Sequence, residues 1–433
     1  MKITLLKNLL ATLLFLVLAT CQLVAQFTLS AEVRPRSEYR NGFKTPTSDD
    51  KDAAFFTEQR SRLYMDYSEE KYKFRLTLQD VRFWGEIPQI FKEEDGNTFL
   101  SEAWGQYFVS KKFSIKAGRQ IISYDNQRFL GGLEWAQQGR RHDALLFIYD
   151  DKESKTKFHA GFAYNSDDDV AEPAKIQADG ANFYSVAGSY KALQYAWFNK
   201  TADKGKISLL ALNAVNQNPD STSSSKQTFG IIGSTNVGKI KIGGDFYYQT
   251  GQIGNNDVNA FLAGLYATFK TKVTPLTLGV EYISGKDDDD DSTDITNFSP
   301  DYGTNHAHNG FMDYFFVGPA NGNVGVMDIY LKTKFKLKKG ALIARAHEFM
   351  TGSTQLDTEG RELDRALGLE LDLVYVVKLA PSVTWHIGYS QLFGTDTLID
   401  LRPGNQKMNS WGWMMITFKP TLLKTKKDEV IIN

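Results

Sequence analysis

The sequence contains little cysteine, little proline and no excess of either charge. Among its 433 residues are one Cys and 11 Pro, and 50 Lys and Arg balance 51 Asp and Glu. A chain of this composition is neither a disulfide scaffold nor collagen-like, and it is not disordered through self-repulsion of like charges. A neutral balance also lacks the basic footprint of a nucleic-acid-binding protein. We therefore expect a folded protein, with no nucleic acid as a partner.

Long hydrophobic runs are missing as well, apart from one near the N-terminus. After residue 25 no stretch reaches the roughly 18 uninterrupted apolar residues of a transmembrane helix, which excludes a helical membrane protein. Lys2 and Lys7 precede an apolar run over 9–19, and Ala25 ends a short polar region. This three-part layout predicts a signal peptide over 1–25, cleaved after Ala25. Cleavage removes Cys21, so the exported chain contains no cysteine.

Aromatic residues are abundant, and apolar and polar residues alternate with a period of two. Phe, Trp and Tyr make up 13% of the chain. Leu63, Met65 and Tyr67 fall on one face of a strand, and the residues between them are polar. The same split recurs in several later segments, over 74–79, 328–337, 367–373 and 385–390. Alternation of this kind predicts β-strands with one apolar and one polar face.

The links between these segments alternate strictly between tight and long. The eight tight links lie at 69–70, 111–112, 151–154, 199–204, 238–239, 271–275, 338–339 and 379–381. The longer links lie near 41–54, 85–99, 126–138, 166–182, 216–225, 252–256, 286–322, 352–363 and 395–408. With a first strand at 27–40 and a last at 409–418, the count is 18 strands.

This pattern predicts an all-β fold, a transmembrane antiparallel up-and-down β-barrel over 26–418. Short turns on one side and long loops on the other are typical of outer-membrane barrels, whose turns are periplasmic and whose loops are extracellular. Residues 419–433 then form a C-terminal periplasmic tail. We expect the outer membrane of a Gram-negative bacterium, with outer-membrane lipid and lipopolysaccharide as surroundings, and the sequence leaves both a monomer and a homo-oligomer open.

The charged face of each strand must point into the barrel. An Arg or Lys facing lipid at the bilayer midplane costs about 2–4 kcal/mol, so a row of them is excluded there. Eighteen strands also enclose a lumen too wide for side chains to fill, which leaves a wet passage. Charged residues on the polar phase are therefore candidates to line a pore. They are Arg34, Arg36, Arg60, Arg62, Asp66, Arg75, Arg345, Glu370 and Asp372.

Guanidinium groups carry forked donors that match carboxylate or phosphate, so these arginines could attract anions. The alternative is that they pair with inward acids such as Glu38, Glu58 or Asp328 and only satisfy the wall.

One segment resembles the hallmark segment of the alginate-export-like outer-membrane porin family. The residues that carry the resemblance are Gly118, Arg119, Gln120, Asp125, Arg128, Leu130, Gly131, Trp135, Arg141 and Asp143. The resemblance implies an 18-stranded barrel with an electropositive, anion-preferring channel, and through it Arg119 joins the candidate pore-lining residues. The family's namesake carries an acidic polysaccharide outward and has a long periplasmic turn late in the chain. The tight link at 379–381 implies that such a lid is absent here.

No catalytic, cofactor or metal site is expected. A Ca²⁺ site in the acidic run 287–291 would need a defined coordination loop, which its spacing lacks. His306 and His308 lack a third fixed ligand. The long link 286–322 is expected to fold into the lumen and narrow it.

The sequence therefore predicts a porin that passes hydrophilic and anionic solutes, or acidic oligosaccharide and polysaccharide, by passive diffusion. One alternative is a barrel enzyme such as a lipid hydrolase, although no Gly-x-Ser-x-Gly elbow is present. The other alternative is a plugged surface anchor or adhesin, which would rest on the long loops.

Overall fold

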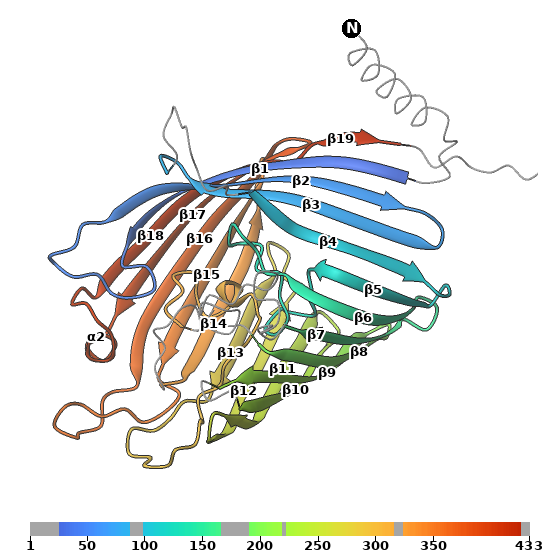
Figure 1. Cartoon of the computed structure of the whole chain (residues 1–433). Helices are drawn as coiled ribbons and strands as arrows, with labels where there is room; N and C mark the ends of the chain where they lie inside the picture. Colours follow the sequence, from blue (N-terminus) through green and yellow to red (C-terminus); the bar gives the residue numbers. More distant parts are fainter. Residues whose placement is uncertain (1–25, 87–97, 166–189, 219–221, 316–323, 426–433) are drawn as a thin grey trace, which may run out of the picture.

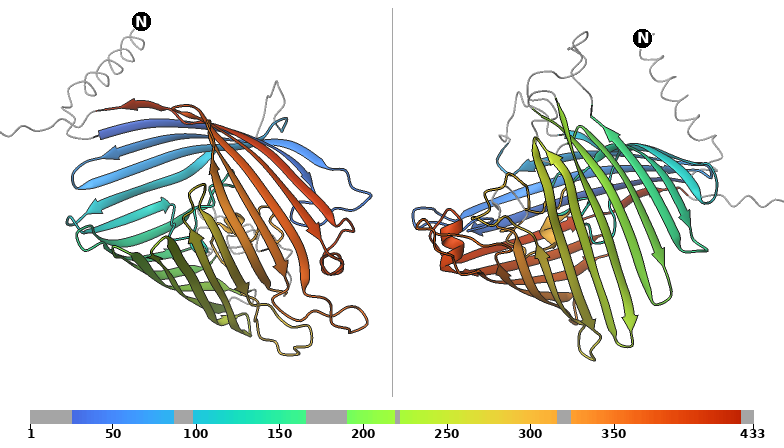
Figure 2. Two further views of the ribbon diagram at one scale, coloured as in Figure 1. Left: turned by 180° about the vertical axis from the view of Figure 1, so that it is seen from behind. Right: turned by 90° about the horizontal axis from the view of Figure 1, so that it is seen from below.

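The chain forms one antiparallel β-sheet that closes on itself into a barrel. The computed structural model describes residues 26–86, 98–165, 190–218, 222–315 and 324–425. Each strand pairs with its neighbours in sequence, and β1 pairs with both β2 and β18. Figure 1 and Figure 2 show the resulting closed wall, which runs from blue β1 to red β18. The 18 long strands of the prediction are confirmed.

The long strands have these bounds: β1 (Gln26–Asn41), β2 (Ala54–Ser68), β3 (Tyr72–Phe83), β4 (Thr98–Phe108), β5 (Phe113–Gln120), β6 (His142–Asp151), β7 (Thr156–Tyr164), β8 (Ala192–Thr201), β9 (Gly205–Gln217), β10 (Ser223–Val237), β11 (Ile240–Ile253), β12 (Asn256–Phe269), β13 (Leu276–Ile283), β14 (Val326–Lys336), β15 (Ala341–Met350), β16 (Ala366–Ala380), β17 (Val383–Gly394) and β18 (Met408–Phe418).

The two faces of the wall differ as the period-two pattern predicts. In β1, Val33 and Tyr39 are 39% and 44% exposed, whereas Arg34 and Arg36 between them are buried. Since side chains alternate across a strand, the exposed apolar residues lie on the outside and the buried arginines on the inside. An apolar outer face against lipid and a polar lumen follow from this arrangement.

The connections fall into a tight-turn end and a loop end. All eight tight turns lie where the sequence places them, between β2 and β3 and then at every second connection up to β16 and β17. One expected longer link is in fact tight: only Gly254 and Asn255 join β11 to β12. Gly254 has φ +60° there, which glycine adopts without the penalty that a Cβ imposes.

The expected tail is in part a strand. Residues of β19 (Thr421–Lys424) pair with Thr28 to Ser30 of β1, on the side of β1 where β18 pairs farther along. Pro420 separates β18 from β19, and its carbonyl accepts a hydrogen bond from Ala31 N at 3.1 Å. The sheet therefore extends beyond residue 418 to residue 424. Residues 1–25, the expected signal peptide, and 426–433 lie outside the described residues.

One α-helix is described, α2 (Asp396–Leu401), in the loop between β17 and β18. No helix in the described part of the chain is long and apolar enough to cross a membrane.

Two long connections fold into the lumen. They are residues 121–141, between β5 and β6, and residues 284–315, after β13; we call them the first and second inner loops. Arg128, Leu130, Met312 and Tyr314 of these loops are at most 1% exposed. The described residues of the second inner loop lie inside the barrel, as predicted. The sequence did not predict that the first inner loop also folds into the lumen.

Candidate functional site

Four inward arginines of β1 and β2 hold the first inner loop by its backbone. Arg34 Nη1 donates to the carbonyl of Glu134 at 2.7 Å, and Arg36 Nη1 donates to that of Trp135 at 2.6 Å. Arg60 reaches the carbonyls of Glu134 and Ala136, and Arg62 that of Gln138, all at 3.3 Å. Charged donors aimed at carbonyls make strong hydrogen bonds in a buried setting. These arginines thus dock a loop rather than stand free in the lumen.

The same arginines also form ion pairs. Arg36 binds Glu38 at 2.7 Å and Glu58 at 3.0 Å, and Arg60 binds Glu32 at 2.6 Å. This arrangement matches the alternative in which the arginines pair with inward acids.

Glu134 of the first inner loop sits among three cations. Its carboxylate lies 2.6 Å from Arg62, 2.9 Å from Arg141 and 3.3 Å from Arg60. Burial raises the pKa of Glu134, but the charges of Arg62, Arg141 and Arg60 outweigh burial and lower it to about 2. The loop therefore contributes a carboxylate that stays ionised in the lumen at neutral pH.

Trp135 joins the first inner loop to the wall and to the second inner loop. Its ring lies 4.2 Å from the guanidinium carbon of Arg36 and stacks on His306 at 4.7 Å. The rings of Trp411 and Trp413, from β18, meet it edge-on at 5.8 and 4.7 Å. His306 in turn bonds Asp313 at 2.7 Å, so the histidine acts in packing.

The family motif residues Arg128 and Gly131 connect the two inner loops. Arg128 is fully buried, forms an ion pair with Glu281 and donates to Asn309 Oδ1 at 3.1 Å. Gly131 N donates to the carbonyl of Tyr302 at 2.7 Å. A Cβ on Gly131 would lie 2.4 Å from Thr304 Oγ1 and 2.7 Å from its nitrogen. Only glycine permits this approach of the two loops.

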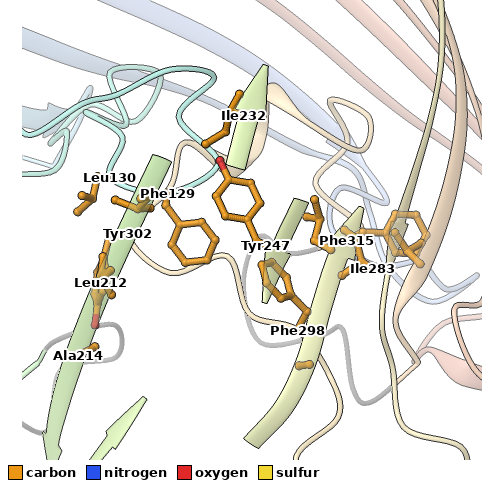
Figure 3. Packing of buried hydrophobic residues seen from close by; sticks show 14 of the residues in the cluster. Phe129, Leu130, Leu212, Ala214, Ile232, Tyr247, Ile283, Phe298, Tyr302 and Phe315 are labelled. Carbon is orange, nitrogen blue, oxygen red and sulfur yellow. The ribbon is translucent and has the colours of Figure 1, made fainter. Parts of the chain in front are cut away.

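An apolar cluster completes the contact between the inner loops and the wall. Phe129 packs against Tyr247 at 5.0 Å and against Phe298 at 5.7 Å. Figure 3 shows Phe129 and Leu130 beside Tyr302, with Tyr247 projecting from the wall toward them. Burial of these rings adds a hydrophobic contribution to the polar contacts of the arginines.

Two of the predicted lumen residues of β15 and β16, Arg345 and Glu370, hold the second inner loop, whereas Asp372 bonds the barrel wall. Glu370 accepts hydrogen bonds from Phe311 N at 2.5 Å and Met312 N at 2.8 Å. Asp372 accepts from Ser390 Oγ at 2.5 Å. Arg345 donates to the carbonyl of Ala307 at 3.2 Å.

Asp66 and Arg75 pair with each other across β2 and β3. The pair lies at 2.6 Å and is about one-third exposed. Among the described residues, neither Asp66 nor Arg75 forms a hydrogen bond with an inner loop.

Arg119 lies on the outer face, contrary to the expectation that it lines the pore. In β5 it shares its phase with Phe113 and Ile115, and it is paired across strands with Asp143 of β6. The Arg119–Asp143 ion pair measures 2.7 Å, and Leu145, two residues along, is 38% exposed on the same face. The pair lies at the loop end of both strands, where polar groups reach the membrane interface.

The other motif residues shape the start of the first inner loop. Asp125 accepts hydrogen bonds from Trp197 Nε1 at 2.7 Å and from Ser208 Oγ at 2.6 Å. Gln120 donates to the carbonyl of Ala144 at 2.9 Å. Gly118 has φ +114°, and a Cβ there would lie 2.2 Å from the carbonyl oxygen of Ala103. The motif is therefore structural at each of these positions.

Acidic and histidine residues of the second inner loop make protein contacts. Asp287 and Asp288 accept from Thr354 N at 2.6 Å and Leu356 N at 2.9 Å, and His308 Nε2 bonds the carbonyl of Asn126 at 3.0 Å. Across the described ranges, no group of three or more His, Cys, Asp or Glu side chains could hold a metal ion.

A cavity of about 250 Å³ stays open beside the inner loops, against β9 to β14. Lys206, Lys241 and Lys332 line it together with Asp125 and Asp245. Sequence reasoning did not select these lysines or Asp245, although they lie on the inward phase of their strands. Their signal was the same alternation that identified the arginines.

A closed barrel of 18 long strands with an apolar outer face and a polar lumen defines an outer-membrane channel for hydrophilic solutes, in a Gram-negative bacterium. The sequence matches the Alginate export family over residues 25–409, and the chain belongs to that family. The predicted family resemblance is confirmed. No curated protein matches the sequence.

Solved structures of Pseudomonas aeruginosa outer-membrane proteins share the fold. OpdO superposes with a TM-score of 0.60 at 13% identity, covering 92% of this chain and 98% of that one. OpdK superposes with a TM-score of 0.59 at 9% identity, again covering 92% and 98%. OccK11 (OpdR) gives 0.58 at 9% identity, covering 92% and 96%. At sequence identities this low, the superpositions establish a common fold and nothing further.

Proposed function

We propose that this channel passes small hydrophilic solutes by passive diffusion and prefers anions. The observation that carries the proposal is the contrast between two sets of inward cations. The arginines of β1 and β2 are buried in contacts with carboxylates and loop carbonyls. Lys206, Lys241 and Lys332 instead line an open cavity, and within the described ranges none forms an ion pair shorter than 4.0 Å. Lysines without a carboxylate partner attract anions yet release them.

The inner loops favour small solutes over a polymer. The first inner loop is fastened across the lumen by Arg34, Arg36 and Arg60, and the second by Glu370. A solute has to pass beside these loops, because their docking bonds involve charged groups that are costly to separate in a buried setting. Export of an acidic polysaccharide would require both loops to leave their docking sites.

We also propose contact between the outer face and lipopolysaccharide. Phe55 and Trp84, at the loop ends of β2 and β3, are 71% and 62% exposed, as in an interfacial aromatic belt. The Arg119–Asp143 pair lies at the loop end too and presents a cation toward lipid phosphates. We further propose that residues 1–25 are a signal peptide cleaved after Ala25, since Lys2 and Lys7 precede the apolar run 9–19 and a short polar region ends at Ala25. Mass spectrometry of the exported chain tests the cleavage site.

Planar-bilayer recording of the purified full chain tests the channel proposal. Under a potassium chloride gradient we expect an open conductance and a reversal potential that favours chloride. Silence would favour a plugged anchor, for which the docked loops provide the supporting observation. Hydrolysis of added phospholipid without conductance would favour the enzyme alternative. A cation-selective conductance would contradict the anion preference.

A further inference from the structure

The open cavity contains charges of both signs that do not neutralise one another. Lys206, Lys241 and Lys332 contribute three positive charges, and Asp125 and Asp245 contribute two negative ones. In the described part of the chain none of these five side chains forms an ion pair shorter than 4.0 Å. A third acid in the lining, Glu281, is already paired with Arg128. The acids are held by neutral donors instead, since Asp125 accepts hydrogen bonds from Trp197 and Ser208 and Asp245 accepts one from Asn126 at 2.7 Å, so none of the five charges has a partner of opposite charge.

The two signs are separated along the strands. Asp245 pairs across the sheet with Gly264, and Asp125 reaches the same level through its 2.6 Å hydrogen bond to Ser208, whose neighbour Ile232 pairs with Asp245. Lys206 lies one step closer to the tight-turn end, and Lys241 and Lys332 lie two steps closer. Each step of two residues spans about 6.6 Å along a strand. The acids therefore lie toward the loops and the lysines toward the turns.

Two aromatic rings, those of Tyr266 and Tyr330, lie at the level of Lys206, between the acids and the level of Lys241 and Lys332. Tyr266 covers Gly243, where a Cβ would lie 2.5 Å from the ring, and Tyr330 covers Gly279, where a Cβ would lie 2.2 Å away. Because glycine lets each ring lie flat on the wall, the rings leave the middle of the cavity open. Lys332 Nζ sits 3.9 Å from the centre of the Tyr330 ring. The cavity thus has an acidic end at Asp245, a middle with the two rings and Lys206, and a basic end at Lys241 and Lys332.

We propose that this cavity is a subsite for small zwitterionic solutes that carry an ammonium and a carboxylate separated by a short apolar chain. The ammonium group binds Asp245 beside Asp125, and the carboxylate binds the lysines. The inference rests on the proposed channel function and names a solute class for it. A simple anion would complete only the basic end and would leave Asp245 without a cation. A zwitterion completes both ends with charge-assisted hydrogen bonds.

The experiment compares three probes of one chain length: 4-aminobutyrate, butyrate and butylammonium. Each is added to the wild-type channel in a planar bilayer, and block of the potassium chloride current is measured. In parallel, binding to the detergent-solubilised full chain is measured by titration calorimetry. We expect 4-aminobutyrate to bind and block about tenfold more strongly than either singly charged probe, since each lost charged hydrogen bond reduces affinity by about that factor.

Two variants assign the ends of the subsite. Asp245→Asn should remove the advantage of 4-aminobutyrate over butyrate, and Lys332→Met should remove its advantage over butylammonium. Lys334→Met is the matched control, because Lys334 faces inward one step beyond Lys332 and does not line the cavity. It should retain the full preference for 4-aminobutyrate.

The outcomes separate this inference from the channel proposal. Equal block by butyrate and 4-aminobutyrate would overturn the zwitterion subsite and leave an anion channel intact. A silent bilayer would overturn the channel proposal alone, and calorimetry would then decide the subsite. Equal binding of the three probes in the calorimeter, or a preference unchanged by Asp245→Asn, would overturn the subsite.

Discussion

Arg36 makes two contacts with Trp135. Its Nη1 donates a hydrogen bond to the Trp135 carbonyl at 2.6 Å, and its guanidinium carbon lies 4.2 Å from the centre of the Trp135 ring. A side chain of β1 thus fixes both the backbone and the ring of the first inner loop, about 100 residues later in the chain. Since Trp135 also stacks on His306, the same contact connects the barrel wall with the second inner loop.

Replacing Arg36 should loosen the first inner loop. Arg36→Leu leaves Glu38 and Glu58 without this partner, so we expect the free energy of unfolding to fall by about 3 kcal/mol. We also expect a larger and noisier single-channel conductance, because the loop loses its hold on the wall. Arg119→Leu, on the outer face, should leave the conductance unchanged. Identical conductance of wild type and Arg36→Leu would contradict the role of this arginine in constriction.

Glu134 should make the docking of the first inner loop sensitive to acid. Its pKa is lowered to about 2 by Arg62, Arg141 and Arg60 in spite of burial. A carboxyl group with a lowered pKa stabilises the folded state fully above its unfolded value, about 4.3, and this contribution is lost as pH falls toward 2. Hydrogen exchange of residues 121–141 should therefore accelerate in that window relative to the strands.

Glu134→Gln should abolish this acid dependence, because the amide does not titrate. In this variant, the first inner loop should exchange faster relative to the strands than it does in wild type at pH 7. That ratio should change little between pH 4 and pH 2. An unchanged acid response in Glu134→Gln would show that another group controls the loop.

Gly131 should tolerate no side chain. Gly131→Ala places a Cβ 2.4 Å from Thr304 Oγ1 and 2.7 Å from Thr304 N, so the two inner loops must separate. We expect a loss of about 1–3 kcal/mol in unfolding free energy, typical of overpacking. Gly105→Ala is the control, since a Cβ there meets nothing within 4 Å. Chemical denaturation in detergent compares the two variants, and equal midpoints would contradict the tight loop contact.

Much of the fold could be predicted from local alternation, because the lipid and the lumen impose opposite demands on successive residues. The eight tight turns and the inward phase of Arg60 and Arg62 follow from that rule alone. The same rule would have placed Arg119 outside, in phase with Phe113 and Ile115, but the family resemblance suggested the lumen instead. The conflict shows that a motif can be shared for the sake of loop geometry.

The contents of the lumen could not be predicted in the same way. Arg34 and Arg36 bind backbone carbonyl groups of the first inner loop. Because every residue type has a backbone carbonyl, the sequence does not reveal which residues accept these hydrogen bonds. The strand β19 escaped prediction for a related reason, since its partner is the start of β1 at the opposite end of the chain. Contacts of this kind depend on closure of the barrel.

The anion preference should depend on the lysines that lack ion pairs. Lys332→Gln removes one such charge from the open cavity, so the reversal potential under a salt gradient should shift toward cation permeation. Arg119→Gln changes the net charge equally but acts on the outer face, so it should not shift the potential. Equal shifts in both variants would indicate an effect of overall charge.

The central claim is that a wet passage with an excess of unpaired inward cations runs beside the docked loops. It is tested most directly by the reversal potential of the wild-type channel in a planar bilayer with a tenfold potassium chloride gradient. The account predicts a stable open conductance and a reversal potential whose sign shows that chloride permeates more readily than potassium. A barrel that conducts nothing, or one whose potential lies on the potassium side, would contradict it.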